Sequence, residues 1–447
     1  MHDLISDLAQ YVAGDFYFNL DDNSKRNENL IRHLSYTQSH GDFADKFEPF
    51  SHLEKLRTFL PFQSSAGNST YSFPAAVGNF LKKKNPLRVL SLSRYAIAGT
   101  QVSPGNSLHL RYLNLSHTTI EELPDFVCEC YNLETLILSS CGSLRKLPIQ
   151  IVKLVLLRHL DIRGSSVTEM PAYFGELKSL QMLTSFVVSN NDQGSKIDEL
   201  GKLTDLHGSL LIDNLQNLAS STEASSAGLS SKQYLHELEF KWSSYTNIQQ
   251  SQDSVLDYLK PHENVKRLKI QNFAGNSLPN WLGNAAFSRM VFLQLEKCKN
   301  CSLVPPLGEL PSLKELHIIK MKNLRMVGSD FYGNTTEPFK SLKIIKFEKM
   351  QNWQVWEPFN QGAGFPSLEE LYIDGCPNLV GRLPDQLLSL SILGIEACDQ
   401  LESLPLAGLT SLSCLTIKAC RKLKHLYETN QEFQQMIGNL QGALSII

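Results

Sequence analysis

Apolar residues recur along most of the chain in the spacing Leu-x-x-Leu-x-Leu, where Ile, Val, Met or Phe also fill the Leu positions. Neighbouring copies are separated by 22 residues (Leu371 to Leu393) to 30 residues (Leu238 to Leu268). Within each copy the apolar residues alternate with period two, which predicts a short strand with one buried face. The copies begin at Leu87, Leu110, Leu133, Leu157, Leu235, Val265, Met290, Leu313, Leu342, Leu368, Leu390 and Leu412.

Two further features keep the same register. A cysteine follows the last strand residue by three positions in five copies, at Cys141, Cys298, Cys376, Cys398 and Cys420. An apolar residue followed by proline comes about ten residues after many strands, as at Leu123-Pro124 and Leu278-Pro279. Proline suits an irregular return path, where no ladder hydrogen bond is lost.

These periods are typical of leucine-rich repeats, whose strands bury their apolar faces only by stacking on neighbouring repeats. The sequence therefore predicts an α/β solenoid, a leucine-rich-repeat horseshoe with a concave parallel β-sheet and an irregular or helical convex side. We expect this domain to span residues 51–427. The pattern weakens between Ser185 and Ser231, where Leu210 and Ile212 indicate one degenerate strand. Residues 428–447 are expected to form a C-terminal cap or tail.

Residues 1–50 have a different pattern. Apolar residues from Met1 to Val12 follow helical spacing, so Met1 to Ala13 is predicted to be an amphipathic helix. Strands are expected around Phe16, Phe18 and Leu20 and again from Ile31 to Tyr36, and Leu56 to Pro61 has the pattern of an imperfect first repeat. One helix and one or two strands cannot form an independent domain, so this segment is interpreted as the remnant of a larger one.

Several segments carry a family resemblance. Met1-His2-Asp3-Leu4 resembles the Met-His-Asp motif that closes the nucleotide-binding switch module of plant coiled-coil NB-LRR disease resistance proteins. Leu110-Arg111-Tyr112-Leu113-Asn114-Leu115-Ser116 and Pro305-Pro306-Leu307-Gly308-Glu309-Leu310-Pro311 are similar to later stretches of that family. The resemblance implies that residues 1–50 are the end of a winged-helix-like switch module and that the repeats form its sensor region.

The same resemblance assigns a cofactor role to two residues. In the parent family the histidine of this motif lies by the β-phosphate of ADP, so His2, with Asp3 supporting it, would contact nucleotide in an intact receptor. The sequence departs from the family because it has no Gly-x-x-x-x-Gly-Lys-Ser/Thr loop, which cradles phosphates through backbone N–H groups. We therefore expect no cofactor in this chain, although the parent family binds ADP or ATP.

Outward positions of the predicted strands are the candidate partner-binding residues. The early strands offer mostly uncharged side chains, whereas the later strands carry both signs of charge, which suits selection of a protein partner by complementarity. The same positions would also be the solvent face of any such sheet. The candidates are Tyr112, Asn114, His159, Asp161, Arg163, Glu237, Glu239, Lys241, Arg267, Lys269, Glu315, His317, Lys346, Glu348, Glu370, Tyr372 and Asp374.

Composition narrows the functional classes. A formal charge of −3 argues against sequence-independent nucleic-acid binding, which needs excess Lys and Arg. No apolar run approaches the ~18–20 residues of a membrane span. Nine cysteines cannot all pair within one chain, which favours reduced thiols and a cytoplasmic location. Cys298-x-x-Cys301 has no second pair at metal-ligand spacing, so packing is favoured over metal binding.

No recognisable catalytic constellation occurs, so the chain is expected not to be an enzyme. The leading hypothesis is a ligand-recognition and autoinhibitory region of an intracellular plant immune receptor. It would bind a pathogen effector or a modified host protein, and also a nucleotide-binding domain within the same chain or in trans. Two alternatives remain: a leucine-rich-repeat substrate adaptor or scaffold unrelated to immunity, and an ATP-hydrolysing switch.

Overall fold

The computed structural model describes residues 11–21, 28–38, 53–63, 70–82, 86–97, 108–191, 193–244, 254–405, 409, 411–424, 431, 434, 438 and 443–446. The chain divides into two compact units, Met1–His207 and Gly208–Ile447. Each unit contains a parallel sheet in which one repeat supplies one strand, so the predicted leucine-rich-repeat solenoid is confirmed.

The sheet of the first unit stacks its strands in chain order. One apolar residue of each strand is buried and pairs with its counterpart in the next strand, as Leu90 does with Leu113 and Leu113 with Leu136. Burial of this column of side chains against its neighbours stabilises the stack. The strands are β1 (Tyr17–Asn19), β2 (His33–Gln38), β3 (Thr58–Gln63), β5 (Val89–Ser91), β7 (Tyr112–Asn114), β8 (Thr135–Ile137), β9 (His159–Asp161) and β10 (Met182–Leu183).

The sheet extends further toward the N-terminus than the expected boundary near residue 50. β2 pairs with β3 over six residues and β1 pairs with β2, so both strands continue the repeat sheet. The predicted strand around Phe16 begins one residue later, because Gly14–Phe16 forms a 3-10 helix and Phe16 is 46% exposed. Most of the predicted helix, including His2 and Asp3, lies outside the described residues.

The sheet of the second unit has longer strands. From β13 to β24 neighbouring strands pair without a register shift, because two apolar columns, one through Leu268 and one through Ile270, are buried side by side. The strands are β12 (Gly208–Asp213), β13 (Leu235–Lys241), β14 (Arg267–Gln271), β15 (Phe292–Glu296), β16 (Glu315–Ile319), β18 (Ile344–Glu348), β20 (Glu370–Asp374), β22 (Ile392–Glu396), β24 (Cys414–Lys418) and β25 (Ala443–Ile446).

The predicted degenerate strand at Leu210 and Ile212 is confirmed, and the C-terminal cap or tail stays a prediction. Leu210 and Ile212 are buried in β12, and the stretch after it contains a short helix. β25 pairs in parallel with β24, so the segment expected to be a cap or tail contains a strand that lengthens the sheet.

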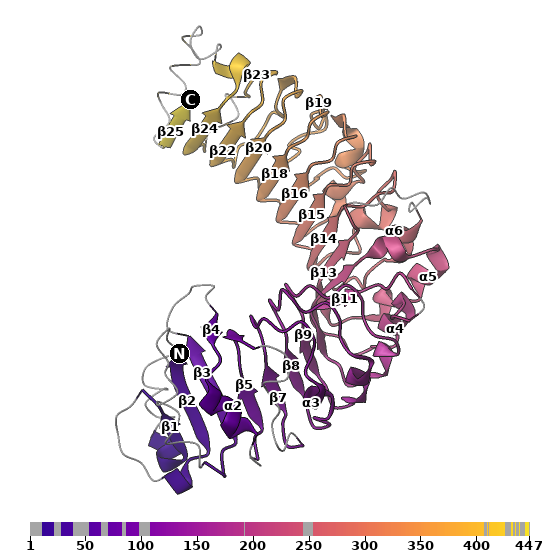
Figure 1. Ribbon diagram of the computed structural model, residues 1–447. Coiled ribbons are helices and arrows are strands. Elements are labelled where there is room, and N and C mark those ends of the chain that lie inside the picture. The colour runs from indigo at the N-terminus through magenta and orange to yellow at the C-terminus, as the bar shows by residue number, and fades with distance from the viewer. Residues whose placement is uncertain are drawn as a thin grey trace. The chain divides into compact units, whose positions relative to one another are not determined.

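Short helices and small sheets make up the return paths. In the second unit, α5 and α6 lie on the opposite side of the repeats from the strands of the main sheet (Figure 1). The described α-helices are α2 (Ala75–Leu81), α3 (Asp125–Cys128), α4 (Ile197–Gly201), α5 (Ser221–Ser225) and α6 (Val255–Tyr258). The remaining strands are β4 (Tyr71–Ser72), β6 (Tyr95–Ala96), β11 (Ser185–Val187), β17 (Met326–Val327), β19 (Val355–Trp356), β21 (Gly381–Arg382) and β23 (Leu401–Ser403).

Short 3-10 helices complete these paths: η2 (Glu28–Leu30), η6 (Ile149–Lys153), η7 (Phe174–Glu176), η8 (Leu215–Asn217), η9 (Leu229–Ser231), η10 (Asn280–Gly283), η11 (Leu307–Glu309) and η12 (Ser329–Phe331). The recurring prolines lie on the return paths, as predicted. Pro124, Pro148 and Pro279 each have an extended ψ and directly precede a helix, where the absent proline N–H removes no hydrogen bond.

The periodic cysteines point into the core, as predicted. All five are at most 2% exposed, and their sulfurs contact backbone carbonyls, for example Cys141 Sγ and Leu115 O at 3.1 Å. Hydrogen bonding to Cys376, together with burial, raises the pKa of Cys398 to about 12. The five cysteines are therefore packing groups of the core. Trp353 and Trp356 are also buried.

Candidate partner-binding surface

The candidates of the first unit lie on two neighbouring rows of its sheet. Tyr112 pairs through Thr135 with His159, and Asn114 pairs through Ile137 with Asp161. Arg163 follows β9 and places its guanidinium 2.9 Å from the Asp161 carboxylate. Burial alone would raise the pKa of Asp161, but hydrogen bonds from Arg163 and Thr184 outweigh it and lower that pKa. The sequence-predicted positions therefore come together, and Asp161 is already engaged within the chain.

The candidates of the second unit form three rows that cross the sheet, which we call the sheet face. Parallel pairing places residues of successive strands side by side at the same level. The first row is Glu237, Arg267, Phe292, Glu315, Ile344, Glu370, Ile392 and Cys414, the middle row is Glu239, Lys269, Gln294, His317, Lys346, Tyr372, Gly394 and Thr416, and the third row is Lys241, Gln271, Glu296, Ile319, Glu348, Asp374, Glu396 and Lys418.

Phe292 is a member of the sheet face that the sequence analysis did not single out. It occupies an outward position yet is only 4% exposed, because neighbouring side chains cover it. The Arg267 guanidinium lies 4.0 Å from the centre of its ring, and the His317 ring meets it edge to face at 5.2 Å. Such contacts favour a fixed arrangement of the cation and both rings.

His317 is a largely enclosed titratable group of the middle row, with a side chain that is 15% exposed. Burial lowers its pKa, and the nearby Lys346 acts in the same direction, whereas Glu315 opposes them. Nε2 lies 2.8 Å from a Glu315 carboxylate oxygen, and this contact opposes the lowering of the pKa.

The charged groups of the sheet face differ in how far they are paired. Lys241 reaches Asp213 at 2.7 Å, and the Lys346 ammonium lies 5.4 Å from the centre of the Tyr372 ring. Glu348, Asp374 and Glu396 are register neighbours in the third row, and no ion pair to them occurs among the described residues. The part of the sheet face around β18, β20 and β22 thus presents carboxylates that a basic partner group can reach.

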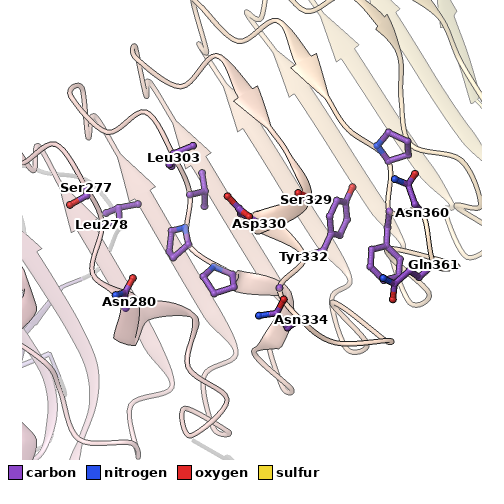
Figure 2. A pocket seen from close by; sticks show the side chains of 16 residues that line it. Ser277, Leu278, Asn280, Leu303, Ser329, Asp330, Tyr332, Asn334, Asn360 and Gln361 are labelled. Carbon is purple, nitrogen blue, oxygen red and sulfur yellow. The ribbon is translucent and has the colours of Figure 1, made fainter.

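A pocket of about 550 Å³ opens among the return loops of the second unit (Figure 2). It lies outside the sheet face, and loops that follow β14, β15, β16 and β19 supply its walls. The lining combines proline and aromatic rings with side-chain amides, and it consists of Ser277, Leu278, Asn280, Leu303, Val304, Pro305, Pro306, Ser329, Asp330, Tyr332, Gly333, Asn334, Pro358, Phe359, Asn360 and Gln361.

An aromatic cluster fixes one wall of this pocket. The centre of the Tyr332 ring lies 5.3 Å from the centre of the Phe359 ring and 5.6 Å from that of Phe365. The Tyr332 hydroxyl donates a hydrogen bond to Glu357 O at 2.8 Å. Phe339 stacks on Phe365 beneath them. The density of aromatic residues between 331 and 365 was the only sequence signal for this feature, and it does not by itself distinguish a pocket wall from ordinary core.

One predicted site falls outside the described residues. His2 and Asp3 are not described, so their proposed contact with nucleotide stays a prediction.

Two leucine-rich-repeat family models match the sequence. The R13L1/DRL21 leucine-rich-repeat model matches residues 197–321, and the At1g61320/AtMIF1 leucine-rich-repeat domain model matches residues 51–203. Among solved structures, the chain resembles a leucine-rich-repeat protein of Leptospira interrogans, with a TM-score of 0.46 and 14% identity over 90% of this chain and 88% of that chain.

The sequence is also similar to curated disease resistance proteins. Disease resistance protein At3g14460 of Arabidopsis thaliana is 39% identical over 89% of this chain and 29% of its own length. Disease resistance RPP13-like protein 1 of the same plant is 40% identical over 89% of this chain and 40% of its own length. RGA1 of Solanum bulbocastanum is 32% identical over 71% of this chain and 32% of its own length. The chain thus spans about a third of the length of these relatives.

In the part of the chain that the structure describes, no helix is long and apolar enough to cross a membrane. The same residues contain no group of three or more His, Cys, Asp or Glu side chains arranged to hold a metal ion. Within the Cys298-x-x-Cys301 motif, Cys301 Sγ approaches Gly275 O at 3.3 Å and both side chains are buried.

Proposed function

Because this chain is a leucine-rich-repeat region of the plant disease resistance protein family, we propose that its sheet face recognises a protein ligand inside the plant cell. The ligand would be a pathogen effector or a host protein that a pathogen has modified. The region is a non-catalytic recognition module in this proposal, and its setting is the cytoplasm.

The observation that carries the proposal is the unbroken register of the three rows from β13 to β24. It converts separate outward residues into a continuous surface on which charges of both signs alternate with Ile344 and Ile392. Mixed charge around apolar side chains selects partners by complementarity and penalises a mismatched charge.

A second task follows from the family. The repeats would also contact a nucleotide-binding domain and hold the receptor in its resting state, with His2 and Asp3 near the β-phosphate of ADP. Ligand binding can release such a state only to the extent that the ligand prefers the active state over the resting one. The ligand surface and the resting contact must therefore compete, directly or through the repeats.

The test exchanges charges on the sheet face. We expect the triple variant Glu239→Lys, Lys269→Glu, Lys346→Glu to lose the resistance response in leaves that carry the receptor containing this region. The measurement is pathogen-dependent cell death, scored at equal protein levels by immunoblot.

The matched control places the same charge changes on exposed residues away from the sheet face, as Glu337→Lys, Lys299→Glu, Lys322→Glu. This control should keep the response. A sheet-face variant that responds like the unmodified receptor would count against the proposal.

A further inference from the structure

The pocket among the return loops of the second unit carries negative charge that its own lining does not neutralise. One carboxylate, Asp330, lines it, and no Lys, Arg or His does so in the part of the chain that the structure describes. The Asp330 side chain is exposed and forms neither an ion pair nor a hydrogen bond with another described residue. The carboxylate is therefore available to a cation from outside the chain.

A smaller cavity of about 50 Å³ adjoins this pocket and adds a second carboxylate, that of Glu357. Glu357 is held in place, because its Oε2 accepts a hydrogen bond from the Ser329 N–H at 3.2 Å and its backbone carbonyl accepts one from the Tyr332 hydroxyl at 2.8 Å. Two negative charges near one site favour a cationic ligand. The residues that line both cavities are Leu303, Val304, Ser329 and Asp330.

Aromatic rings form part of the uncharged lining. The ring centres of Tyr332 and Phe359 lie 5.3 Å apart. Gly364 permits this arrangement, because a Cβ there would lie 2.9 Å from the Tyr332 ring and 3.0 Å from Phe359 Cβ. Figure 2 shows the Asp330 side chain between Leu303 and Tyr332. A cation bound to Asp330 would thus lie near aromatic rings, whose faces attract positive charge.

Side-chain amides supply further hydrogen-bond acceptors. Asn280, Asn334, Asn360 and Gln361 line the pocket, are exposed, and form no side-chain hydrogen bond with other described residues. An arginine guanidinium is planar, carries five N–H donors in fixed directions and stacks on aromatic faces, so it can use carboxylate, amide oxygens and rings together. A lysine ammonium is a compact point charge without a flat face. The lining therefore favours arginine over lysine.

The size and the open rim of the pocket favour a side chain presented by another protein. Its volume of about 550 Å³ lies within the ~300–1,000 Å³ range of ligand sites. Small molecules in such sites are enclosed over most of their surface, whereas the polar side chains that line this pocket are exposed. Leu303, which is 60% exposed, adds apolar surface that residues beside the arginine can contact.

We propose that this pocket binds an arginine side chain that projects from an exposed segment of a partner protein. The guanidinium lies between Asp330 and the rings of Tyr332 and Phe359, and the flanking residues of the partner contact Leu303. Contacts between successive repeats already fix the rings and Glu357, so binding requires little ordering of the lining. The pocket shares no residue with the sheet face, so this proposal and the one made for the sheet face can fail separately.

The probe is the acetylated and amidated pentapeptide Gly-Leu-Arg-Leu-Gly, titrated onto the full chain and followed by saturation-transfer difference NMR. We expect saturable transfer that is strongest at the arginine side-chain protons. A peptide with citrulline, which has the shape of arginine without its charge, should bind about tenfold more weakly. A lysine peptide should bind more weakly than the arginine peptide and more tightly than the citrulline peptide.

Two variants test the assigned residues. Asp330→Asn removes the charge with little change of shape and should weaken binding of the arginine peptide about tenfold. Phe359→Leu removes a ring face and should weaken it about threefold. The matched control Asp385→Asn neutralises an exposed carboxylate of the same unit that lines neither cavity, and it should change the affinity less than about twofold.

Thermal unfolding of each variant identifies a folding defect, and the comparison of arginine with citrulline needs no change in the protein. Three results would overturn the proposal. One is a citrulline or lysine peptide that binds as tightly as the arginine peptide. Another is equal loss of binding in Asp330→Asn and Asp385→Asn. The third is tighter binding of agmatine, a free guanidinium compound, than of the peptide, which would assign the pocket to a small molecule.

Discussion

At the scale of single residues, His317 combines several of the forces that shape the sheet face. Its ring lies between Phe292 on one neighbouring strand and Lys346 on the other, with Glu315 on its own strand and Glu348 nearby. Burial and Lys346 disfavour the protonated form more than the two carboxylates favour it, so the pKa is lowered. The imidazole is therefore neutral at pH 7, and protonation would place a charge in an enclosed site.

This shift predicts a pH dependence of stability. Because the folded-state pKa of His317 is below the unfolded value near ~6.5, the unfolded chain binds the proton more readily once the pH falls below ~6.5. Acidification should thus lower the free energy of unfolding, and His317→Gln should remove part of that loss. Urea denaturation at neutral and mildly acidic pH, followed by tryptophan fluorescence, measures the difference. An equal loss in both proteins would contradict the assignment.

At the residue scale, the sequence predicts which strand residues point outward, but not which of them are covered by neighbours. Period-two alternation correctly predicted that Glu237, Lys269 and Tyr372 point outward. The same rule does not predict how far neighbouring repeats cover an outward residue. Phe292 lies outward and is nevertheless buried, because Arg267 and His317 from adjacent repeats close over its ring. That covering depends on which side chains become neighbours about 25 residues apart, and a single strand contains no information about them.

At the scale of elements, the return paths pack so closely that glycine is required where two of them meet. A Cβ on Gly308 would collide with the carbonyl of Tyr332 in the next repeat. A Cβ on Gly283 would lie 2.7 Å from Pro306 O. The backbone of one 3-10 turn thus rests directly on the next path, and this contact fixes the spacing of the repeats on the side away from the sheet.

We expect Gly308→Ala to destabilise the protein by about 1–3 kcal/mol, because the added methyl group forces the two paths apart. Gly142→Ala is the matched control, since nothing lies within 4 Å of its Cβ position and its φ is not left-handed. Chemical denaturation with far-UV circular dichroism gives both free energies of unfolding. Equal stabilities of the two variants would show that the paths can separate freely.

The elements of the sheet were predictable because strand length, buried cysteines and prolines all repeat. The pocket was not, because its walls come from loops of different lengths after β14, β15, β16 and β19. Pro305, Tyr332 and Phe359 meet only when three successive repeats are stacked. The sequence therefore predicted which segments form return loops, but not that three of these loops meet to form a pocket.

At the scale of the whole molecule, each repeat is stabilised by its immediate neighbours. Leu316 lies fully buried in β16, between Leu293 and Ile345. Leu316→Ala should cost about 2–5 kcal/mol through lost burial and the cavity left behind. In a one-dimensional stack such damage decays with distance along the repeats.

Hydrogen exchange followed by mass spectrometry should therefore show faster exchange in β15, β16 and β18 of this variant, with smaller changes in β13 and β22. A uniform increase across the second unit would instead indicate that all its repeats unfold as a single cooperative block.

The unshifted register from β13 to β24 has a consequence for how this surface can diversify over generations. Each repeat contributes one side chain to each of the three rows. An inserted repeat can pair with the neighbouring strand as long as its own strand keeps the two inward apolar residues. Gain or loss of one repeat-length stretch of coding DNA would lengthen or shorten all three rows by one position at once. New combinations of outward side chains could therefore arise by unequal crossing-over, without each core contact having to be found again by point mutation.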